Sequence, residues 1–476
     1  MNKKCQVFTP KNYVKELLDS VGYTHNLYGK KVLENSCGDG NILAVVVQRY
    51  IEDCFENGLS RTKIKNGLAR DIYGIEIDKE QKEKCIARLN NILVKNNIKP
   101  VSWKIFDVDY LKWGIDIKFQ YIIGNPPYIT YSELGDDDRK YVKEKYNSCK
   151  KGKFDYCYAF IEKSIDELDV DGKMSYLIPS SIFKTVFGKS LRGIIKKYIM
   201  EIRDYPLKKI FDEALVKSSI IVLYKNRQQD YLRYREMSTQ NAIDISLNRL
   251  GDKWFFTDTW AHGQYRFGDF FRVSHVVATL LNEAYVLSNG SYKEVEDGYI
   301  CEGIMIERNV IRSTDTPRSL RYNKNEKIIF PYRYNENGIV HYNEDEFEQN
   351  FPGATAYLMK FKDKLDKRKK DNNARWFEYG RSQALKGLNC SKLLMSTVIT
   401  NVVEISELSQ ECIPYAGMYI AVKNDNSQYT LGDAEIVLSS DAFLQYIKNV
   451  GIPISGQSVR ITSKDVEDYK FDSWRN

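Results

Sequence analysis

The most constraining feature of this sequence is a pair of adjacent prolines that ends an apolar run. The run covers residues 119–124 and ends in Gly124, a pattern typical of a buried strand in a parallel sheet. Pro126 and Pro127 follow closely, and neither can donate a hydrogen bond to a neighbouring strand. The strand must therefore stop, and Asn125 is held in an extended conformation. We expect a stiff loop at the carboxyl end of a strand, where open α/β sheets bind their ligands.

The groups on this loop suit the activation of a nucleobase amine. Such an amine is a poor nucleophile because its lone pair is delocalised into the ring. The Asn125 side-chain oxygen and the Pro126 carbonyl could accept its two N–H bonds, while Tyr128 could stack on the base. Positioning and directed hydrogen bonds can supply the rate without a side chain that titrates near neutral pH. The four residues taken alone are equally consistent with a surface turn.

Strand-like and helix-like segments alternate over the first half of the chain. Short strands are expected at residues 31–34, 72–78, 101–106 and 121–124. Such alternation indicates an α/β fold with a doubly wound, mostly parallel sheet. The polar stretch 225–230 is the expected boundary between domains 1–230 and 231–476. The second half lacks this alternation of strands and helices, and one long helix is expected there over residues 354–370.

Charge is distributed unevenly along the chain. Residues 1–230 contain 40 basic and 31 acidic residues, whereas residues 231–476 contain 31 basic and 33 acidic residues. The excess is dense directly after the proline loop, so we expect a surface there that contacts a nucleic-acid backbone. The residues assigned to this surface are Arg139, Lys140, Lys150, Lys151 and Lys153.

The composition argues against several protein classes. No signal peptide and no apolar run of about 18 residues are recognisable, so a cytoplasmic protein without a membrane span is expected. The nine cysteines are scattered and form no CxxC pair, which indicates reduced thiols. The four histidines lie far apart, so no metal site is expected.

Acidic residues stand at the ends of three successive expected strands. Glu34 precedes a glycine-containing turn, and a second acid, Asp39, lies within the turn, so a phosphate would be repelled and a cationic or zwitterionic ligand favoured. Glu76 is placed where a carboxylate can accept from two ribose hydroxyls. Asp107 could accept from an adenine amino group. Each acid alone is more often a surface or capping residue, but together they indicate a nucleoside site, and S-adenosylmethionine has this character.

These motifs, in their order, resemble those of the gamma-class adenine-N6 DNA methyltransferases of restriction-modification systems. Phe8-Thr9-Pro10 resembles the motif that closes over the cofactor, with Thr9 expected to cap a helix that starts at Pro10. Residues 32–40 resemble the first cofactor motif, although Asn35-Ser36 stand where Pro-Ala is commoner. Residues 73–78 resemble the second, and Asn125–Tyr128 match the catalytic motif.

The resemblance implies a class I S-adenosylmethionine-dependent methyltransferase fold, with a seven-stranded sheet in residues 1–230. Residues 231–476 would form a mixed α+β domain for DNA target recognition. Implied catalytic residues are Asn125, Pro126, Pro127, Tyr128 and, facing the flipped base, Phe211. Implied cofactor contacts are Phe8, Thr9, Pro10, Glu34, Asn35, Cys37, Gly38, Gly40, Glu76, Ile77, Asp107, Val108 and Asn125.

The function implied is methyl transfer from S-adenosylmethionine to N6 of an adenine that is flipped out of double-stranded DNA. A monomer with a separate restriction endonuclease is expected. Arg333 and Arg381 have the residue type that reads guanine edges. The alternatives are methylation of RNA or of a protein glutamine through the same loop, and a DNA-binding subunit without catalysis.

Overall fold

The chain folds into two compact units, Met1–Asp258 and Thr259–Asn476. The structure is a computed structural model that describes residues 9–205, 217–239, 241–256, 263–423, 429–454 and 457–472. The first unit reaches past the expected boundary at residue 230, because the chain adds two more strands to its sheet before it ends.

A nine-stranded sheet forms the centre of the first unit, in the order β3-β2-β1-β4-β5-β7-β6-β8-β9. Its strands are β1 (Val32–Glu34), β2 (Ile72–Ile75), β3 (Lys104–Phe106), β4 (Phe119–Gly124), β5 (Leu168–Pro179), β6 (Ile199–Asp204), β7 (Ser218–Tyr224), β8 (Tyr231–Glu236) and β9 (Asn241–Ser246). The first five strands in this order are parallel, and β7 runs antiparallel between β5 and β6. The expected α/β, mostly parallel arrangement is confirmed, and β8 and β9 extend it beyond seven strands.

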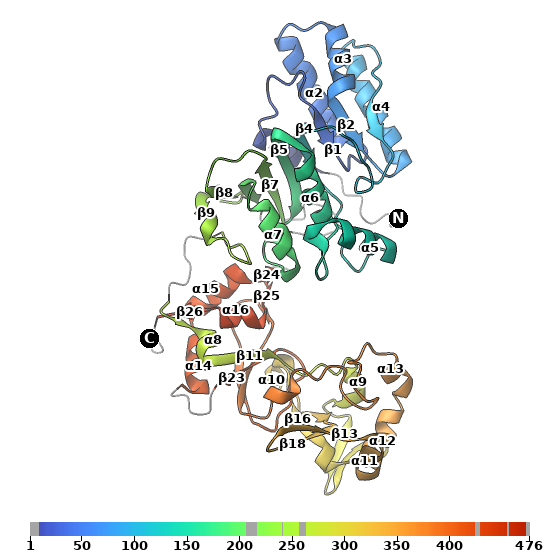
Figure 1. The fold of residues 1–476 in the computed structure, drawn as a ribbon. Coiled ribbons are helices and arrows are strands. Elements are labelled where there is room, and N and C mark those ends of the chain that lie inside the picture. The colour runs from blue at the N-terminus through green and yellow to red at the C-terminus, as the bar shows by residue number, and fades with distance from the viewer. Residues whose placement is uncertain are drawn as a thin grey trace. The chain divides into compact units, whose positions relative to one another are not determined.

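Helices cover both faces of this sheet (Figure 1). They are α1 (Lys11–Ser20), α2 (Asn41–Glu56), α3 (Arg61–Asp71), α4 (Lys79–Lys95), α5 (Asp136–Lys145), α6 (Cys157–Glu167) and α7 (Lys189–Ile195). Consecutive residues of β4 point to opposite faces: Ile122 packs in the core that contains α6, and Ile123 in the core that contains α1, α2 and α4. A central strand of a doubly wound sheet is buried in this way on both faces.

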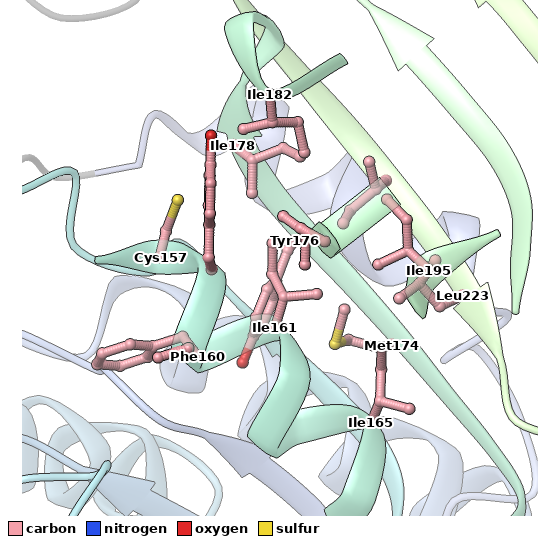
Figure 2. Close-up of a cluster of buried hydrophobic side chains, with 14 of the residues drawn as sticks. Cys157, Phe160, Ile161, Ile165, Met174, Tyr176, Ile178, Ile182, Ile195 and Leu223 are labelled. Atoms are coloured by element: carbon pink, nitrogen blue, oxygen red, sulfur yellow. The ribbon is translucent and has the colours of Figure 1, made fainter. Parts of the chain in front are cut away.

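The core on the α6 face holds strands β4, β5 and β7 together. Figure 2 shows Ile161 and Ile165 of α6 beside Met174 and Tyr176 of β5, with Leu223 of β7 nearby. These side chains are at most 2% exposed. Each buried side chain of this kind contributes roughly 1.5–3 kcal/mol. Such packing fixes β5, and through the β4–β5 pairing it fixes the strand that leads into the proline loop.

The second unit is built from small antiparallel sheets and short helices, which confirms the expected mixed α+β structure. Its strands are β10 (Tyr265–Arg266), β11 (Phe271–His275), β12 (Val286–Leu287), β13 (Tyr292–Val295), β14 (Gly298–Cys301), β15 (Ile304–Glu307), β16 (Ile311–Thr314), β17 (Glu326–Ile329), β18 (Tyr332–Asn335), β19 (Gly338–His341), β20 (Lys392–Met395), β21 (Val398–Ile399), β22 (Ile405–Leu408), β23 (Met418–Val422), β24 (Ile452–Pro453), β25 (Val459–Arg460) and β26 (Lys470–Phe471). Its helices are α8 (Phe267–Phe270), α9 (Asn282–Tyr285), α10 (Pro317–Arg321), α11 (Glu344–Asn350), α12 (Pro352–Met359), α13 (Lys362–Asp366), α14 (Leu431–Leu438), α15 (Asp441–Val450) and α16 (Ser463–Glu467).

The expectation of one long helix over residues 354–370 is wrong. The segment forms two helices, α12 and α13, separated at Lys360 and Phe361. Both residues donate their backbone N–H groups three positions back, to Tyr357 and Leu358, which tightens the end of α12. Over the described residues, none of the helices combines the length and the apolar character that crossing a membrane requires.

Candidate active site

Asn125 occupies the first position after β4 and is held at two of its atoms. The pairing between β4 and β5 ends at Gly124, opposite Tyr176. The Asn125 side-chain Nδ2 donates to Thr9 Oγ1 at 3.2 Å, and the Asn125 backbone carbonyl accepts from Ser36 Oγ at 3.0 Å. The side-chain oxygen Oδ1 is buried and finds no donor among the described residues. Asn125 therefore keeps a desolvated acceptor available for a ligand N–H group.

The rest of the loop supplies a rigid backbone and an aromatic side chain. Pro126 is buried, and Pro127 and Tyr128 are partly buried. The Tyr128 side chain packs against the core on the α1, α2 and α4 face. Burial raises the pKa of Tyr128 well above its ordinary value, so the phenol stays neutral. The loop thus offers an aromatic group without adding a charge.

The turn after β1 is shaped by two glycines with left-handed backbone conformations. Gly38 has φ +52° and Gly40 has φ +84°, and Gly40 is the N-cap of α2. A Cβ atom at Gly40 would lie 2.6 Å from Cys85 Sγ, so the turn packs directly on α4. The buried Cys37 donates its N–H to the Ile75 carbonyl at 2.9 Å, which links the turn to the end of β2.

Glu76 joins the glycine turn to the end of β2. Its Oε2 accepts from the Gly38 N–H at 2.8 Å, and its Oε1 accepts from the Asp78 N–H at 2.9 Å. Burial raises the pKa of Glu76. The neighbouring Ile77 is 46% exposed, and an exposed apolar side chain beside a carboxylate suits a nucleoside. This pair therefore has the chemistry expected for a ribose and its base.

The other two acids differ in their surroundings. Glu34 is 3% exposed, its Oε2 accepts from the Leu43 N–H in the first turn of α2, and burial raises its pKa well above the ordinary value. Asp107 is paired with Lys82 at 3.0 Å, and this hydrogen bond lowers its pKa. Val108, next to it, packs against the core on the α6 face. Direct contact of Glu34 or Asp107 with a cofactor stays a prediction.

Asn35 is part of a buried polar network beneath the loop. Its Nδ2 donates to Ser164 Oγ at 3.0 Å and to the Tyr176 hydroxyl. Ser164 in turn contacts the Tyr110 hydroxyl at 3.0 Å, and Tyr110 donates to Glu167 at 2.6 Å. The network ties the turn after β1 to β5 and α6, so Asn35 has a structural role as well as its expected place beside the cofactor.

Phe8 and Phe211 lie outside the described residues. The expectation that Thr9 caps α1 is wrong, because the N-cap is Pro10 and no side chain caps that end. Thr9 is instead 6% exposed and bonded to Asn125. The sequence predicts no role for Ser36, because nothing in the neighbouring residues indicates its bond to Asn125, 89 residues away.

Asp155 is a further residue near the loop that the sequence did not indicate. It forms an antiparallel bridge with Thr130, and the next residue, Tyr156, donates its N–H to the Ile129 carbonyl at 2.9 Å. Burial raises the pKa of Asp155 to about 6. The carboxyl therefore lies where the chain leaving the proline loop meets the start of α6.

We expect Asp155→Asn to stabilise the protein at pH 8 more than at pH 5. Burial disfavours the charged carboxylate, so the folded state carries no penalty below the pKa of the unfolded chain, about 4. As pH rises through about 6, the carboxyl ionises in its buried position and this stability is lost. At pH 8 the substitution should therefore add about 1–3 kcal/mol to the free energy of unfolding. Thermal unfolding at both pH values, with the exposed Asp136→Asn as control, measures this difference. An equal effect at both pH values would contradict it.

The basic residues after the loop divide into two groups. Arg139 donates to the Tyr131 and Ser132 carbonyls at 2.8 and 3.0 Å, so its guanidinium holds the loop. Lys150 donates to Asn147 at 2.5 Å. The other three, which are exposed, are Lys140, Lys151 and Lys153.

The two arginines expected to read bases in the second unit are both paired with acids. Arg333 lies 3.5 Å from Glu346 and over the Tyr342 ring, and Arg381 lies 2.8 Å from Asp371. Their side chains are 55% and 43% exposed, respectively. The described residues contain no group of three or more His, Cys, Asp or Glu side chains that could hold a metal ion.

Comparison with known proteins shows what the first unit is similar to. Residues 27–211 match the Eco57I restriction-modification methylase family. The Type II methyltransferase M.BstVI of Geobacillus stearothermophilus is 28% identical over 51% of this chain and 47% of its own length. The Type II restriction enzyme and methyltransferase RM.Eco57I of Escherichia coli is 22% identical over 83% of this chain and 49% of its own. The chain thus spans about half the length of these relatives.

Solved structures show the same fold over nearly the whole chain. The Type IIL restriction-modification enzyme MmeI, solved in complex with DNA, has a TM-score of 0.61 at 13% identity, covering 97% of this chain and 64% of MmeI. A nuclease-deletion mutant of the Type ISP enzyme LlaGI, solved with a DNA substrate mimic, has a TM-score of 0.55 at 14% identity, covering 97% and 46%. The resemblance seen in the sequence motifs is confirmed.

Proposed function

We propose that this protein, in which residues 27–211 match the Eco57I restriction-modification methylase family, is a site-specific DNA methyltransferase acting on adenine N6. The observation that carries the choice of an exocyclic amine as methyl acceptor is the buried, unbonded Oδ1 of Asn125 at the carboxyl end of β4. A buried acceptor without a donor is costly unless a ligand supplies one. An exocyclic amine supplies that donor.

The residues of the site fit S-adenosylmethionine. At the Cβ position of Gly38 no described atom lies within 4 Å, which would leave space for the ligand beside the backbone of the turn. Glu76 would accept from the ribose hydroxyls, and Ile77 would pack beside the nucleoside. When bound, S-adenosylmethionine supplies an electrophilic methyl group and leaves as a neutral thioether.

In the proposed mechanism, Asn125 Oδ1 and the Pro126 carbonyl accept the two N–H bonds of the flipped adenine. This arrangement turns the nitrogen lone pair out of conjugation and toward the methyl group. Tyr128 stacks on the base and replaces the neighbours that the base loses when it leaves the duplex. With the methyl donor bound, the nitrogen would gain an N–C bond as the donor loses its S–C bond, and the methylated ammonium would release one proton to water. Positioning and hydrogen bonding therefore account for the rate.

The second unit would recognise the target sequence, and a separate restriction endonuclease would be the partner of the methyltransferase. Arg333 and Arg381 would contact base edges only after leaving Glu346 and Asp371. Each exchange replaces one ion pair with a bidentate contact to guanine, which contributes about 1–3 kcal/mol of discrimination. Their pairing in the free protein is consistent with a readout that forms on binding.

We expect the triple variant Lys140→Gln, Lys151→Gln, Lys153→Gln to weaken DNA binding without changing sequence preference. Each lost phosphate contact should reduce the slope of log affinity against log salt by about 1. The slope is measured by fluorescence anisotropy with a short duplex. Lys99→Gln, an exposed lysine just before β3, is the control. Arg139→Gln should leave the slope unchanged, because that guanidinium is bound to loop carbonyls.

The decisive experiment offers double-stranded DNA, RNA and a translation release factor to the full chain with radiolabelled S-adenosylmethionine. Label in DNA that is recovered after digestion as N6-methyl-2′-deoxyadenosine supports the proposal. Label in RNA or on a glutamine would favour one of the alternative substrates. Tight cofactor binding without any transfer, or no cofactor binding in calorimetry, would identify a silent DNA-binding subunit.

A further inference from the structure

Two hydrogen bonds reach Asn125 from distant parts of the chain. Thr9 lies just before α1 and is 116 residues from Asn125, and Ser36 lies in the turn after β1, 89 residues away. Thr9 is 6% exposed, so its hydroxyl is shielded from competition with water. Neither contact belongs to a strand ladder or a helix. Both partners act on the one residue whose orientation the proposed reaction requires.

The two bonds restrain different degrees of freedom of Asn125. In the bond to Thr9, the Asn125 side-chain amide donates through Nδ2. This bond fixes the torsions of the Asn125 side chain and leaves Oδ1 available. The bond from Ser36 takes the backbone carbonyl, which fixes the peptide plane between Asn125 and Pro126. Along the chain, the Asn125 side chain is attached on the N-terminal side of this peptide, and the Pro126 carbonyl is on its C-terminal side. Both acceptors of the proposed mechanism are therefore aligned by these two hydroxyls.

We propose that Thr9 and Ser36 are positioning residues that hold Asn125 and Pro126 in the reacting geometry. The inference rests on the proposed methyl transfer. Ser36 also lies in the turn expected to contact the cofactor, so its hydroxyl ties the cofactor turn to the catalytic loop. Alignment of this kind affects the rate strongly, since a misplacement of about 1 Å can cost a hundredfold.

Thr9→Val and Ser36→Ala test this inference. Thr9→Val replaces the hydroxyl with a methyl group of similar volume, and Ser36→Ala removes one oxygen atom. The single-turnover rate of methyl transfer should fall roughly ten- to a hundredfold in each variant. The dissociation constant for sinefungin, measured by calorimetry, should change less than about threefold, and the unfolding midpoint should stay near that of the wild type. Thr9→Ser keeps the hydroxyl and should restore most of the rate.

A control variant removes a hydroxyl elsewhere in the same unit. Ser20 Oγ donates to the Leu17 carbonyl at 2.8 Å in the last turn of α1, so Ser20→Ala should leave the rate unchanged. If the wild type methylates DNA and both test variants react at its rate, the positioning role is wrong while the proposed function stands. If the rate of a variant falls together with its sinefungin affinity or its unfolding midpoint, the hydroxyl has a merely structural role, and the positioning role is again wrong. A wild type that transfers no methyl group overturns both.

Discussion

Asn125→Ala is expected to lower the rate of DNA methylation by about a hundred- to a thousandfold and to leave cofactor affinity within about threefold of the wild type. The substitution removes Oδ1, the acceptor that would bind the adenine amine as its nitrogen becomes tetrahedral. That hydrogen bond strengthens only as the reaction proceeds, so its loss affects the rate and not the binding of either substrate. Single-turnover methylation and calorimetry with sinefungin measure the two quantities.

The control for this prediction is Asn226→Ala. Asn226 lies on the exposed loop after β7, and its side chain contacts Asp171 at 3.3 Å. The Asn226 variant should methylate DNA at the wild-type rate. A rate for Asn125→Ala within about tenfold of the wild type would show that some other group activates the amine. Cofactor binding that disappears together with the rate would instead place Asn125 in the cofactor site alone.

Glu76→Ala is expected to weaken S-adenosylmethionine binding about a hundredfold. Its carboxylate would accept from two ribose hydroxyls, and each hydrogen bond to a charged group contributes about 1.5–3 kcal/mol. The same oxygens accept from the Gly38 and Asp78 N–H groups, so the alanine variant also loosens the glycine turn. Glu76→Gln keeps one acceptor oxygen and should lose about tenfold. Calorimetric titration gives both dissociation constants.

Glu80→Ala is the matched control, since Glu80 is four residues away, 73% exposed and paired with Lys84. Its cofactor affinity should equal that of the wild type. The thermal unfolding midpoint of each variant separates lost ligand contacts from a loosened turn. An affinity for Glu76→Ala within about threefold of the wild type would mean that the ribose lies elsewhere, and the assignment of the cleft would then fail.

Much of the candidate site follows from local sequence rules. An apolar run ending in Gly124 forms β4, and Pro126 and Pro127 end it, because prolines cannot continue a ladder. Helix α4 begins directly after Asp78, because the Asp78 side chain caps its first turn. The glycines of the turn after β1 adopt the left-handed conformations that favour glycine. Each of these rules involves residues close together in the chain.

Contacts between distant segments could not be predicted from the same rules. The bonds that hold Asn125 come from Thr9 and Ser36, and a hydroxyl gives no sign of a partner many residues away. The raised pKa of Asp155 depends on burial, which no neighbouring residue in the sequence reports. The extension of the first unit past residue 230 depends on β8 pairing with β6. Steric and capping preferences act over a few residues and are visible in the order of amino acids, whereas desolvation and long-range hydrogen bonds arise only when the folded chain brings its segments together.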